Sequence, residues 1–366
     1  MFETNSTNSD MISFFISLGG KNSDSSKPDS ISVYTSTEEE VYSLNNGVGL
    51  RFLSDFAIVE LRGNDSLEFL HRISTNSMKD LAKEEIKKTI FTSEKGRIIG
   101  VSTVMNFDGY LLLITGSNSK QKVMIWLNKY IVGDDVKVND ASHRFNVFEI
   151  SGPQSNSYLS LFIGNAASDI QENYFKVVNA EGILFFLAKF KDHKGLDKFW
   201  ILAEQENGKK LVANMVENKG PFDFSLIGDD AYNAYRIENG IAVDPNELND
   251  NFNPHEARLI DLVDSKKGCF IGQEVIARLD TYDKVQKSIV GLCFPEQVDS
   301  SEKFSLLDDQ KNEIGNITSI AFSPKFKKNI ALGYVKKSLA VQGTKVIAKN
   351  ENKIFEVTIH ELPFKK

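Results

Sequence analysis

The apolar residues of the first half of the chain change repeatedly between a strand-like and a helix-like spacing. Residues 56–62 alternate as in a strand, while apolar side chains from Leu67 to Ile73 recur at helical intervals behind a cap at Asp65 or Ser66. The expected elements after the first strand and helix are strands at 98–107 and 110–115 around an Asp108-Gly109 turn, a helix at 123–131 and a strand at 136–138. This β-α-β-β-α-β order is the ferredoxin-like arrangement.

A weaker second copy of this pattern follows, and then a β-rich segment. The expected elements of the second copy are a strand at 146–150, a helix at 155–163, strands at 174–178, 183–190 and 199–202, and a helix at 208–215. Further helices are expected at 38–44, at 229–239 and after Gly272. From Ser288 onward, short β segments separated by turn residues predict a small barrel or sandwich.

These patterns predict an α+β protein with two ferredoxin-like α/β units and a C-terminal β-barrel. Residues 19–31 are rich in Gly, Ser, Asp and Lys, so we expect residues 1–32 to form a flexible tail. The expected domains are residues 33–144, residues 145–285 and residues 286–366.

Composition narrows the classes of function. Of the 366 residues, 43 are basic and 50 acidic, and the resulting charge of −7 disfavours a nucleic-acid surface. The apolar runs are too short to span a bilayer, and we expect a cytoplasmic protein without a signal peptide. With two cysteines and five scattered histidines, the chain is expected to hold no metal.

The segment from Lys266 to Arg278 (KKGCFIGQEVIAR) is the most informative stretch for chemistry. Its two glycines predict a tight turn that enters a helix, because glycine adopts positive φ freely. Cys269 stands just before that helix beside two lysines, a setting that favours the thiolate. On spacing alone, a second interpretation stays open: Cys269 is a small buried residue, and Glu274–Arg278 is a solvated ion pair.

A second cluster is Arg236-Ile237-Glu238-Asn239-Gly240, at the end of the helix expected at 229–239. Together with Pro254-x-Glu256 and Lys267-Gly268-Cys269-Phe270-Ile271-Gly272-Gln273-Glu274, it resembles the folate-binding superfamily of the glycine-cleavage T-protein. Within that superfamily, the last block is similar to the YgfZ-type branch of iron–sulfur maturation factors. The resemblance covers roughly residues 33–362 and implies a ring of two α/β units and a barrel around a central folate channel.

The resemblance also implies a function and a set of site residues. It implies that the protein binds a reduced folate such as tetrahydrofolate and assists iron–sulfur cluster assembly or repair in client proteins, including tRNA-modifying enzymes. Cys269 would be the functional thiol, expected at the mouth of the cavity. The residues expected to contact folate or support the site are Arg236, Glu238, Lys267, Gly268, Gly272, Gln273, Glu274 and Arg278. Arg236 is expected either to meet the folate carboxylate tail or to hold Glu238.

Two departures from the T-protein pattern bear on catalysis. The strand entry at 95–101 contains no carboxylate where T-proteins carry an acidic pair, and residues 195–201 offer Phe199 and Trp200 where T-proteins carry a pterin-binding glutamate. Whether the protein is an enzyme therefore stays open. The alternatives are a tetrahydrofolate-dependent aminomethyl- or methyltransferase, with a carboxylate supplied from another position, and an interaction scaffold with an empty channel.

Overall fold

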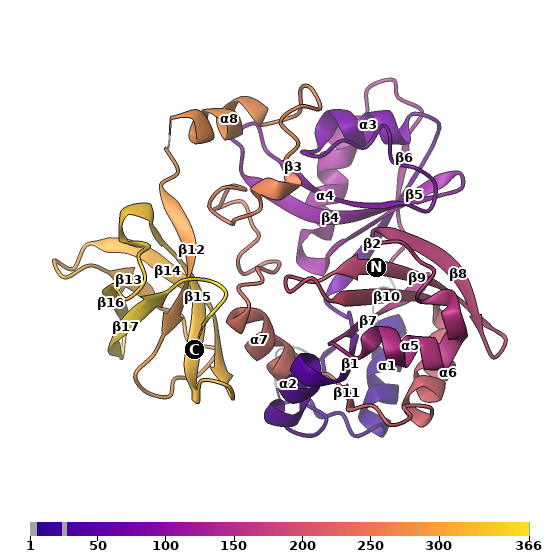
Figure 1. Ribbon diagram of the computed structural model, residues 1–366. Helices are drawn as coiled ribbons and strands as arrows, with labels where there is room; N and C mark the ends of the chain where they lie inside the picture. The colour runs from indigo at the N-terminus through magenta and orange to yellow at the C-terminus, as the bar shows by residue number, and fades with distance from the viewer. Residues whose placement is uncertain (1–5, 24–27, 283, 366) are drawn as a thin grey trace.

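The computed structural model describes residues 6–23, 28–282 and 284–365. Two α/β units lie one above the other, and a β-barrel stands beside them, with helix α7 (Asp229–Glu238) between the barrel and the second unit (Figure 1). The predicted α+β fold class, with two α/β units and a C-terminal barrel, is confirmed. No helix in the described ranges is both long and apolar enough to cross a membrane.

The first α/β unit is an antiparallel sheet in the order β3-β4-β5-β2-β6. Its strands are β2 (Phe56–Arg62), β3 (Ile86–Thr92), β4 (Ile98–Phe107), β5 (Tyr110–Gly116) and β6 (Lys137–Asp140). Helices α3 (Ser66–Ile73) and α4 (Ser117–Tyr130) cover one face, where residues such as Phe69 and Leu127 join a buried cluster with the sheet. The predicted hairpin is present with its turn at Asp108-Gly109, whereas the pattern did not predict edge strand β3.

The second unit is a larger sheet in the order β11-β1-β7-β10-β9-β8. Its strands are β1 (Val48–Phe52), β7 (Phe145–Ser151), β8 (Tyr174–Ala180), β9 (Ile183–Lys191), β10 (Asp197–Glu204) and β11 (Phe224–Leu226). Helices α5 (Ser155–Ile163) and α6 (Gln205–Glu217) pack on one face through buried residues such as Tyr158 and Leu211. The pattern did not predict β1 and β11. In the second sheet, β1 from the first part of the chain lies between β11 and β7.

The free faces of the two sheets pack against each other. Their shared core contains Ile58, Met105 and Leu112 of the first sheet and Phe175 and Trp200 of the second. Backbone bonds also join the sheets at one edge, where the Ile86 N–H donates to the Asn173 carbonyl at 2.7 Å. The two units therefore form one block of four layers, with helices on both outer faces.

The expectation of a flexible tail over residues 1–32 is wrong for the described part of that segment. Helix α1 (Ser6–Ser17) packs on the second unit, and Met11, Ile12 and Phe15 are at most 5% exposed. Phe15 stacks on Phe52 of β1 with 5.5 Å between ring centroids. Burial of the apolar face of α1 fixes this helix on the second unit, although the residues that follow it are polar. Residues 1–5 and 24–27 lie outside the described part.

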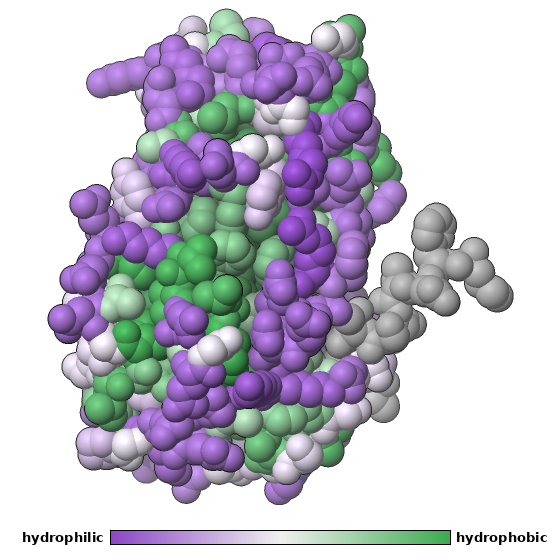
Figure 2. Space-filling view, turned by 90° about the vertical axis from the view of Figure 1, so that its right-hand side faces the viewer, coloured by the Kyte–Doolittle hydropathy of each residue, from purple (hydrophilic) through white to green (hydrophobic). Residues whose placement is uncertain are grey.

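The outer side of this block carries exposed apolar side chains. Figure 2 shows hydrophobic residues among charged ones on the side where β8, α5 and α6 lie in Figure 1. Val177 of β8, Leu184 of β9 and Leu161 of α5 are each more than half exposed. Single exposed apolar residues of this kind are common on folded proteins.

The C-terminal unit is a closed barrel in the order β12-β15-β14-β13-β16-β17. Its strands are β12 (Lys287–Cys293), β13 (Ser305–Leu307), β14 (Glu313–Ser323), β15 (Lys328–Lys336), β16 (Lys345–Lys349) and β17 (Ile354–His360). Helix α8 (Gln273–Thr281) precedes the barrel, and helix α2 (Thr37–Asn46) lies beside α7. Short 3-10 helices occupy Gly164–Ala166, Ile260–Leu262 and Lys337–Leu339.

Candidate ligand-binding site

A cavity of about 430 Å³ lies where the two α/β units meet α7 and the loop that follows it. Its walls come from β1, the β1–β2 loop, the start of α4, α7 and residues 243–246, together with residues 28–30. The charged and aromatic side chains of its lining are Arg51, Asp55, Asp229, Tyr232, Arg236 and Asp244. An open groove of about 510 Å³ beside α2 is lined by none of the residues that the sequence singled out.

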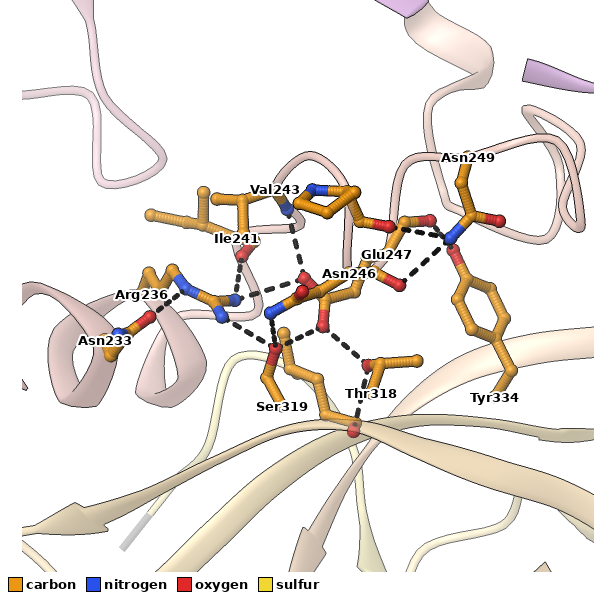
Figure 3. A network of polar contacts seen from close by, with 12 residues as sticks. Asn233, Arg236, Ile241, Val243, Asn246, Glu247, Asn249, Thr318, Ser319 and Tyr334 are labelled. Atoms are coloured by element: carbon orange, nitrogen blue, oxygen red, sulfur yellow. Dashed lines mark hydrogen bonds and ion pairs between the residues drawn. The ribbon is translucent and has the colours of Figure 1, made fainter. Parts of the chain in front are cut away.

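Arg236 is the predicted site residue that lines this cavity, and most of its guanidinium is engaged by the protein (Figure 3). Its Nη1 lies 3.2 Å from Oε2 of Glu247, and its Nη2 donates to the Ser319 hydroxyl at 2.7 Å. Its Nε donates to Oδ1 of Asn233 at 2.8 Å. The alternative in which Arg236 holds Glu238 is wrong, because Glu247 takes that place.

Glu238 points away from the cavity and toward the barrel. It is 3% exposed, and the Ser323 hydroxyl of β14 donates to its Oε1. Burial raises the pKa of the Glu238 carboxyl above its ordinary value. Its backbone carbonyl also accepts from the N–H of Phe364 at 2.8 Å. These contacts join the end of α7 to the barrel and do not line the cavity.

Arg51 is a second buried guanidinium in the cavity wall, and it is not among the site residues expected from the sequence. Its Nη2 donates to Oδ2 of Asp55 at 2.8 Å, and its guanidinium lies 3.7 Å from the ring centroid of Tyr232. The pKa of Arg51 is raised: burial alone would lower it, but the Asp55 and Asp229 carboxylates and Tyr232 more than compensate. A signal was available, since Arg51 is the one charged residue in the otherwise apolar strand VGLRF.

Beside Arg51, the second sheet presents a carboxylate at Glu149. Cross-strand register places Arg51 opposite Glu149, and Glu149 opposite Trp200, on the face that meets the first sheet. The Trp200 indole donates to Oε2 of Glu149 at 2.9 Å, and Nζ of Lys198 lies 3.2 Å from the same oxygen. The pKa of Glu149 is lowered, because Lys198, Trp200 and Arg51 together outweigh the effect of burial. A carboxylate of β7 therefore lies next to Trp200, whereas Asp197, the carboxylate of residues 195–201, pairs with Lys189 and Lys191.

Asp244 brings another carboxylate to the cavity, at the start of α4. Its Oδ1 accepts from the Ser119 hydroxyl at 2.5 Å, and its Oδ2 accepts from the Ser119 N–H at 3.1 Å. Burial raises the pKa of Asp244 in spite of these bonds. Gly116 permits this approach, because a Cβ there would lie 2.3 Å from Oδ2 of Asp244.

The segment 266–274 lies against the first α/β unit, and none of its residues lines the cavity. Nζ of Lys267 donates to the carbonyl of His71 in α3, and Nε2 of His71 is 3.0 Å from the carbonyl oxygen of Lys267. Desolvation lowers the pKa of Lys267 to about 8. The Thr92 hydroxyl of β3 donates to the carbonyl of Ile271 at 2.6 Å. Both ends of the segment are thus anchored to the first unit.

The local geometry of this segment agrees with the predicted turn into a helix. Gly268 and Gly272 have φ of 99° and 85°, and α8 begins at Gln273. A Cβ on Gly272 would come within 2.5 Å of the Ser93 carbonyl oxygen, so this position requires glycine for two reasons. Cys269 is exposed on the turn, so the interpretation of it as a buried apolar residue is wrong.

Two further expectations concern the start of α8 and metal binding. Glu274 and Arg278 are exposed and, within the described helix, form no ion pair with each other. Residues 6–23, 28–282 and 284–365 contain no cluster of three or more His, Cys, Asp or Glu side chains that could hold a metal ion. The polar groups that do converge are those of the cavity, and they suit an organic ligand with acidic and hydrogen-bonding groups.

Comparisons with known proteins cover most of the chain. Residues 19–267 match the family described as the GCVT N-terminal domain, and residues 287–366 match the glycine cleavage T-protein C-terminal barrel domain. An aminomethyltransferase of Desulfitobacterium hafniense is 28% identical over 304 residues, which are 82% of each chain. A putative chloroplastic transferase of Arabidopsis thaliana is 27% identical over 344 residues, which are 90% of this chain and 74% of that protein.

A solved structure supports the same fold. The crystal structure of the glycine cleavage system aminomethyltransferase T from Bartonella henselae matches with a TM-score of 0.81 and covers 96% of both chains. Its sequence identity of 20% is low, so this likeness establishes the arrangement of the units and the barrel.

Proposed function

This chain belongs to the glycine-cleavage T-protein family, and from that premise we propose that it binds a reduced folate in the cavity lined by Arg51 and Arg236. We further propose that it acts as a YgfZ-type factor, which supports the assembly or repair of iron–sulfur clusters in client enzymes. Enzymes that modify tRNA are included among these clients. The first proposal concerns the cavity and the second concerns the surface around Cys269.

The observation that carries the folate proposal is unused hydrogen-bonding capacity in the cavity wall. Nε of Arg51 and Oδ1 of Asp55 are buried and have no hydrogen-bond partner among the described residues. Buried polar atoms without partners are rare in folded proteins and call for an explanation. A folate carries both carboxylates, which a guanidinium binds through its planar fork, and N–H groups, which a carboxylate accepts. A volume of about 430 Å³ is within the range of sites for small organic ligands.

Fluorescence can test this proposal directly, because the chain has two tryptophans in different places. Trp126 of α4 packs into the core of the first unit, whereas Trp200 lies beside Glu149, the cross-strand neighbour of the cavity residue Arg51. In a Trp126→Phe variant, folinic acid should quench the remaining emission in a saturable way. Loss of Arg51 in Arg51→Gln should weaken binding about tenfold or more, while exposed Arg62→Gln should not. No saturable binding of folinic acid, by quenching or by calorimetry, would contradict the proposal.

The iron–sulfur proposal draws on the block Lys267 to Glu274 and on the exposure of its cysteine. Cys269 is exposed, on a turn that Lys267 and Ile271 fasten to the first unit. A thiol presented in this way is open to a partner protein, unlike Cys293, which is half-buried in the barrel. The proposal therefore places the contact with clients on the outer surface and the folate in the interior.

Complementation of a deletion strain tests the role of the thiol. Cys269→Ala should fail to restore the activity of iron–sulfur enzymes, while Cys293→Ala should restore it. Both variants should reach the same cellular level as the wild type. Full restoration by Cys269→Ala would remove the thiol from the proposed function.

A second candidate, a tetrahydrofolate-dependent aminomethyl- or methyltransferase, is favoured by a specific observation. Asp55, Asp229 and Asp244 line the cavity, so carboxylates are available although residues 98–101 supply none. The names of several relatives as aminomethyltransferases agree with this candidate. A steady-state assay with tetrahydrofolate and an aminomethyl or methyl donor should then show turnover that Asp244→Asn removes. No turnover with an active folate-binding preparation would reject it.

A further inference from the structure

Strand β8, which stands at one end of the second sheet, has an edge that is open over most of its length. Only its first residues are covered on that side, where the N–H of Phe175 donates to the carbonyl of Glu84 at 2.9 Å. Backbone groups of a strand point alternately to its two edges, so Val177 and Asn179 point theirs the same way as Phe175. No backbone bond joins either residue on that side to another described residue. Their N–H and carbonyl groups are therefore available to another strand.

Beside this edge, exposed apolar side chains are neighbours on one face of the sheet. Val177 is 61% exposed and lies opposite the half-buried Phe186 of β9, while Leu184, 55% exposed, lies opposite Asn179. This face begins at the buried Phe175, in the core between the two sheets. The first sheet covers Phe175 but leaves the far end of the β8–β9 hairpin open, on the side of the molecule shown in Figure 2.

A second copy of β8 can use this edge in one antiparallel register. Two identical strands related by a two-fold axis pair antiparallel, and the axis passes through a residue that faces its own copy. With the axis at Val178, Val177 of each copy lies opposite Asn179 of the other, so every available N–H and carbonyl finds a partner. An axis at Val177 would require the edge of Phe175, which is already occupied, and an axis at Asn179 would require Glu181, where β8 has ended.

Charge indicates that β8 fits its own copy better than an unrelated strand. A lysine on an open edge ordinarily opposes pairing, and Lys176 is exposed and forms no ion pair in the part of the chain that the structure describes. With the axis at Val178, Lys176 lies opposite Ala180 of the other copy and beside its Glu181. Oε2 of Glu181 accepts from Nδ2 of Asn214 in α6 at 3.0 Å, so Glu181 lies on the helix-covered face. Lys176 points to that same face, because it alternates with the buried Val178.

We propose that the chain forms a two-fold symmetric dimer through β8, in which the second sheets of two copies join into one continuous sheet. Val177 and Leu184 of both copies are covered in this dimer, and Lys176 of each copy pairs with Glu181 of the other. β8 lies on the outer side of the α/β block, away from the barrel, and no residue of β8 lines the cavity (Figure 1). Both cavities and both Cys269 turns stay accessible, so the dimer is independent of the proposed function.

Cysteine cross-linking tests the register. In a chain that carries Cys269→Ser and Cys293→Ser, one of Val177→Cys, Val178→Cys or Asn179→Cys is added, and the protein is oxidised with copper phenanthroline. Val178→Cys should give a disulfide-linked dimer, because residues facing each other at this kind of position have Cα atoms about 4.5 Å apart, within reach of a disulfide. The other two variants should cross-link about tenfold more slowly or less, because their cysteines are diagonal neighbours about 7–8 Å apart. Faster cross-linking of either one would overturn the register, and no cross-linking in any variant would overturn the dimer.

Sedimentation of the full chain measures the dimer without a cross-link. The wild type should change from monomer to dimer between about 1 μM and 1 mM. Lys176→Glu and Glu181→Lys should each weaken association about tenfold or more, because like charges then meet at both symmetric contacts. The double reversal should restore association to within about threefold of the wild type, and its failure to do so would overturn the pairing of Lys176 with Glu181.

A matched pair of lysine substitutions tests the apolar part of the interface. Val177→Lys should abolish the dimer, because it places charges next to each other on the covered face. Val132→Lys is the control, since Val132 is 83% exposed after α4, and it should leave association unchanged. A wild type that stays monomeric up to about 1 mM, or equal association of the two variants, would overturn the proposal.

Discussion

Arg236 of α7 pairs with Glu247 in the loop that follows α7, with 3.2 Å between Nη1 and Oε2 and side-chain exposures of 2% and 0%. The Thr318 and Ser319 hydroxyls of β14 donate to the other oxygen of Glu247 at 2.5 and 2.6 Å. The pair therefore connects α7, the loop and the barrel at the edge of the cavity (Figure 3). A charge at this depth needs its partner, because an uncompensated ion in the protein interior is poorly solvated.

Removal of one partner should therefore be costly. Glu247→Gln is expected to lower the free energy of unfolding by about 3–5 kcal/mol, measured by urea denaturation. Lys345→Met serves as the control, since it breaks an exposed pair with Glu356, and should change stability by about 1 kcal/mol or less. A loss below about 1 kcal/mol for Glu247→Gln would mean that the buried pair is not needed for stability.

The N-terminal helix should contribute to the stability of the whole second unit. Phe15 is 1% exposed against Phe52 and Phe148, whereas its neighbour Ile16 is 50% exposed. Phe15→Ala is expected to lower the free energy of unfolding by about 3–5 kcal/mol. Ile16→Ala on the same helix should cost less than about 1 kcal/mol. Equal effects of the two substitutions in urea denaturation would show that α1 is not packed on the sheet.

Lys267 should make stability depend on pH in the alkaline range. Its pKa is lowered to about 8 in the folded protein, while an unfolded lysine titrates near 10.4. Between these values the unfolded chain holds a proton that the folded chain has released, so rising pH favours the folded state. From about pH 8 to 10, the wild type should gain stability relative to Lys267→Met. The variant Lys266→Met, at an exposed neighbouring position, should follow the wild type, and urea denaturation at several pH values measures the difference.

The two thiols should react at different rates with a disulfide reagent such as DTNB. Cys269 is exposed, whereas Cys293 is half-buried and burial raises the pKa of its thiol. The thiolate is the reactive form, so Cys293 should react more slowly by on the order of tenfold or more. The absorbance of the thiolate that DTNB releases should rise in a fast and a slow phase. The substitution Cys269→Ser should remove the fast phase. A single fast phase in Cys269→Ser would contradict the exposure of the two residues.

Several features could be predicted from neighbouring residues alone. The hairpin of β4 and β5 follows from two alternating segments around Asp108-Gly109, and the turn into α8 follows from Gly268 and Gly272. These features depend on contacts within a few positions, where side-chain period and allowed φ values decide the conformation. The barrel strands and helices α3 to α6 of the two α/β units were predicted for the same reason, whereas α1 was not.

The composition of the site depended on contacts between distant parts of the chain. Arg236 pairs with Glu247, and not with Glu238, which is nearer in the sequence, because the loop after α7 folds back on it. Arg51 lies opposite Glu149 because β1 joins a sheet formed mainly by later strands. The segment of Cys269 packs on α3 instead of lining the cavity. The sequence by itself determined the elements, the turn glycines and the family pattern. Tertiary structure decided which charges share a cavity, because burial selects partners by position in space and not by distance along the chain.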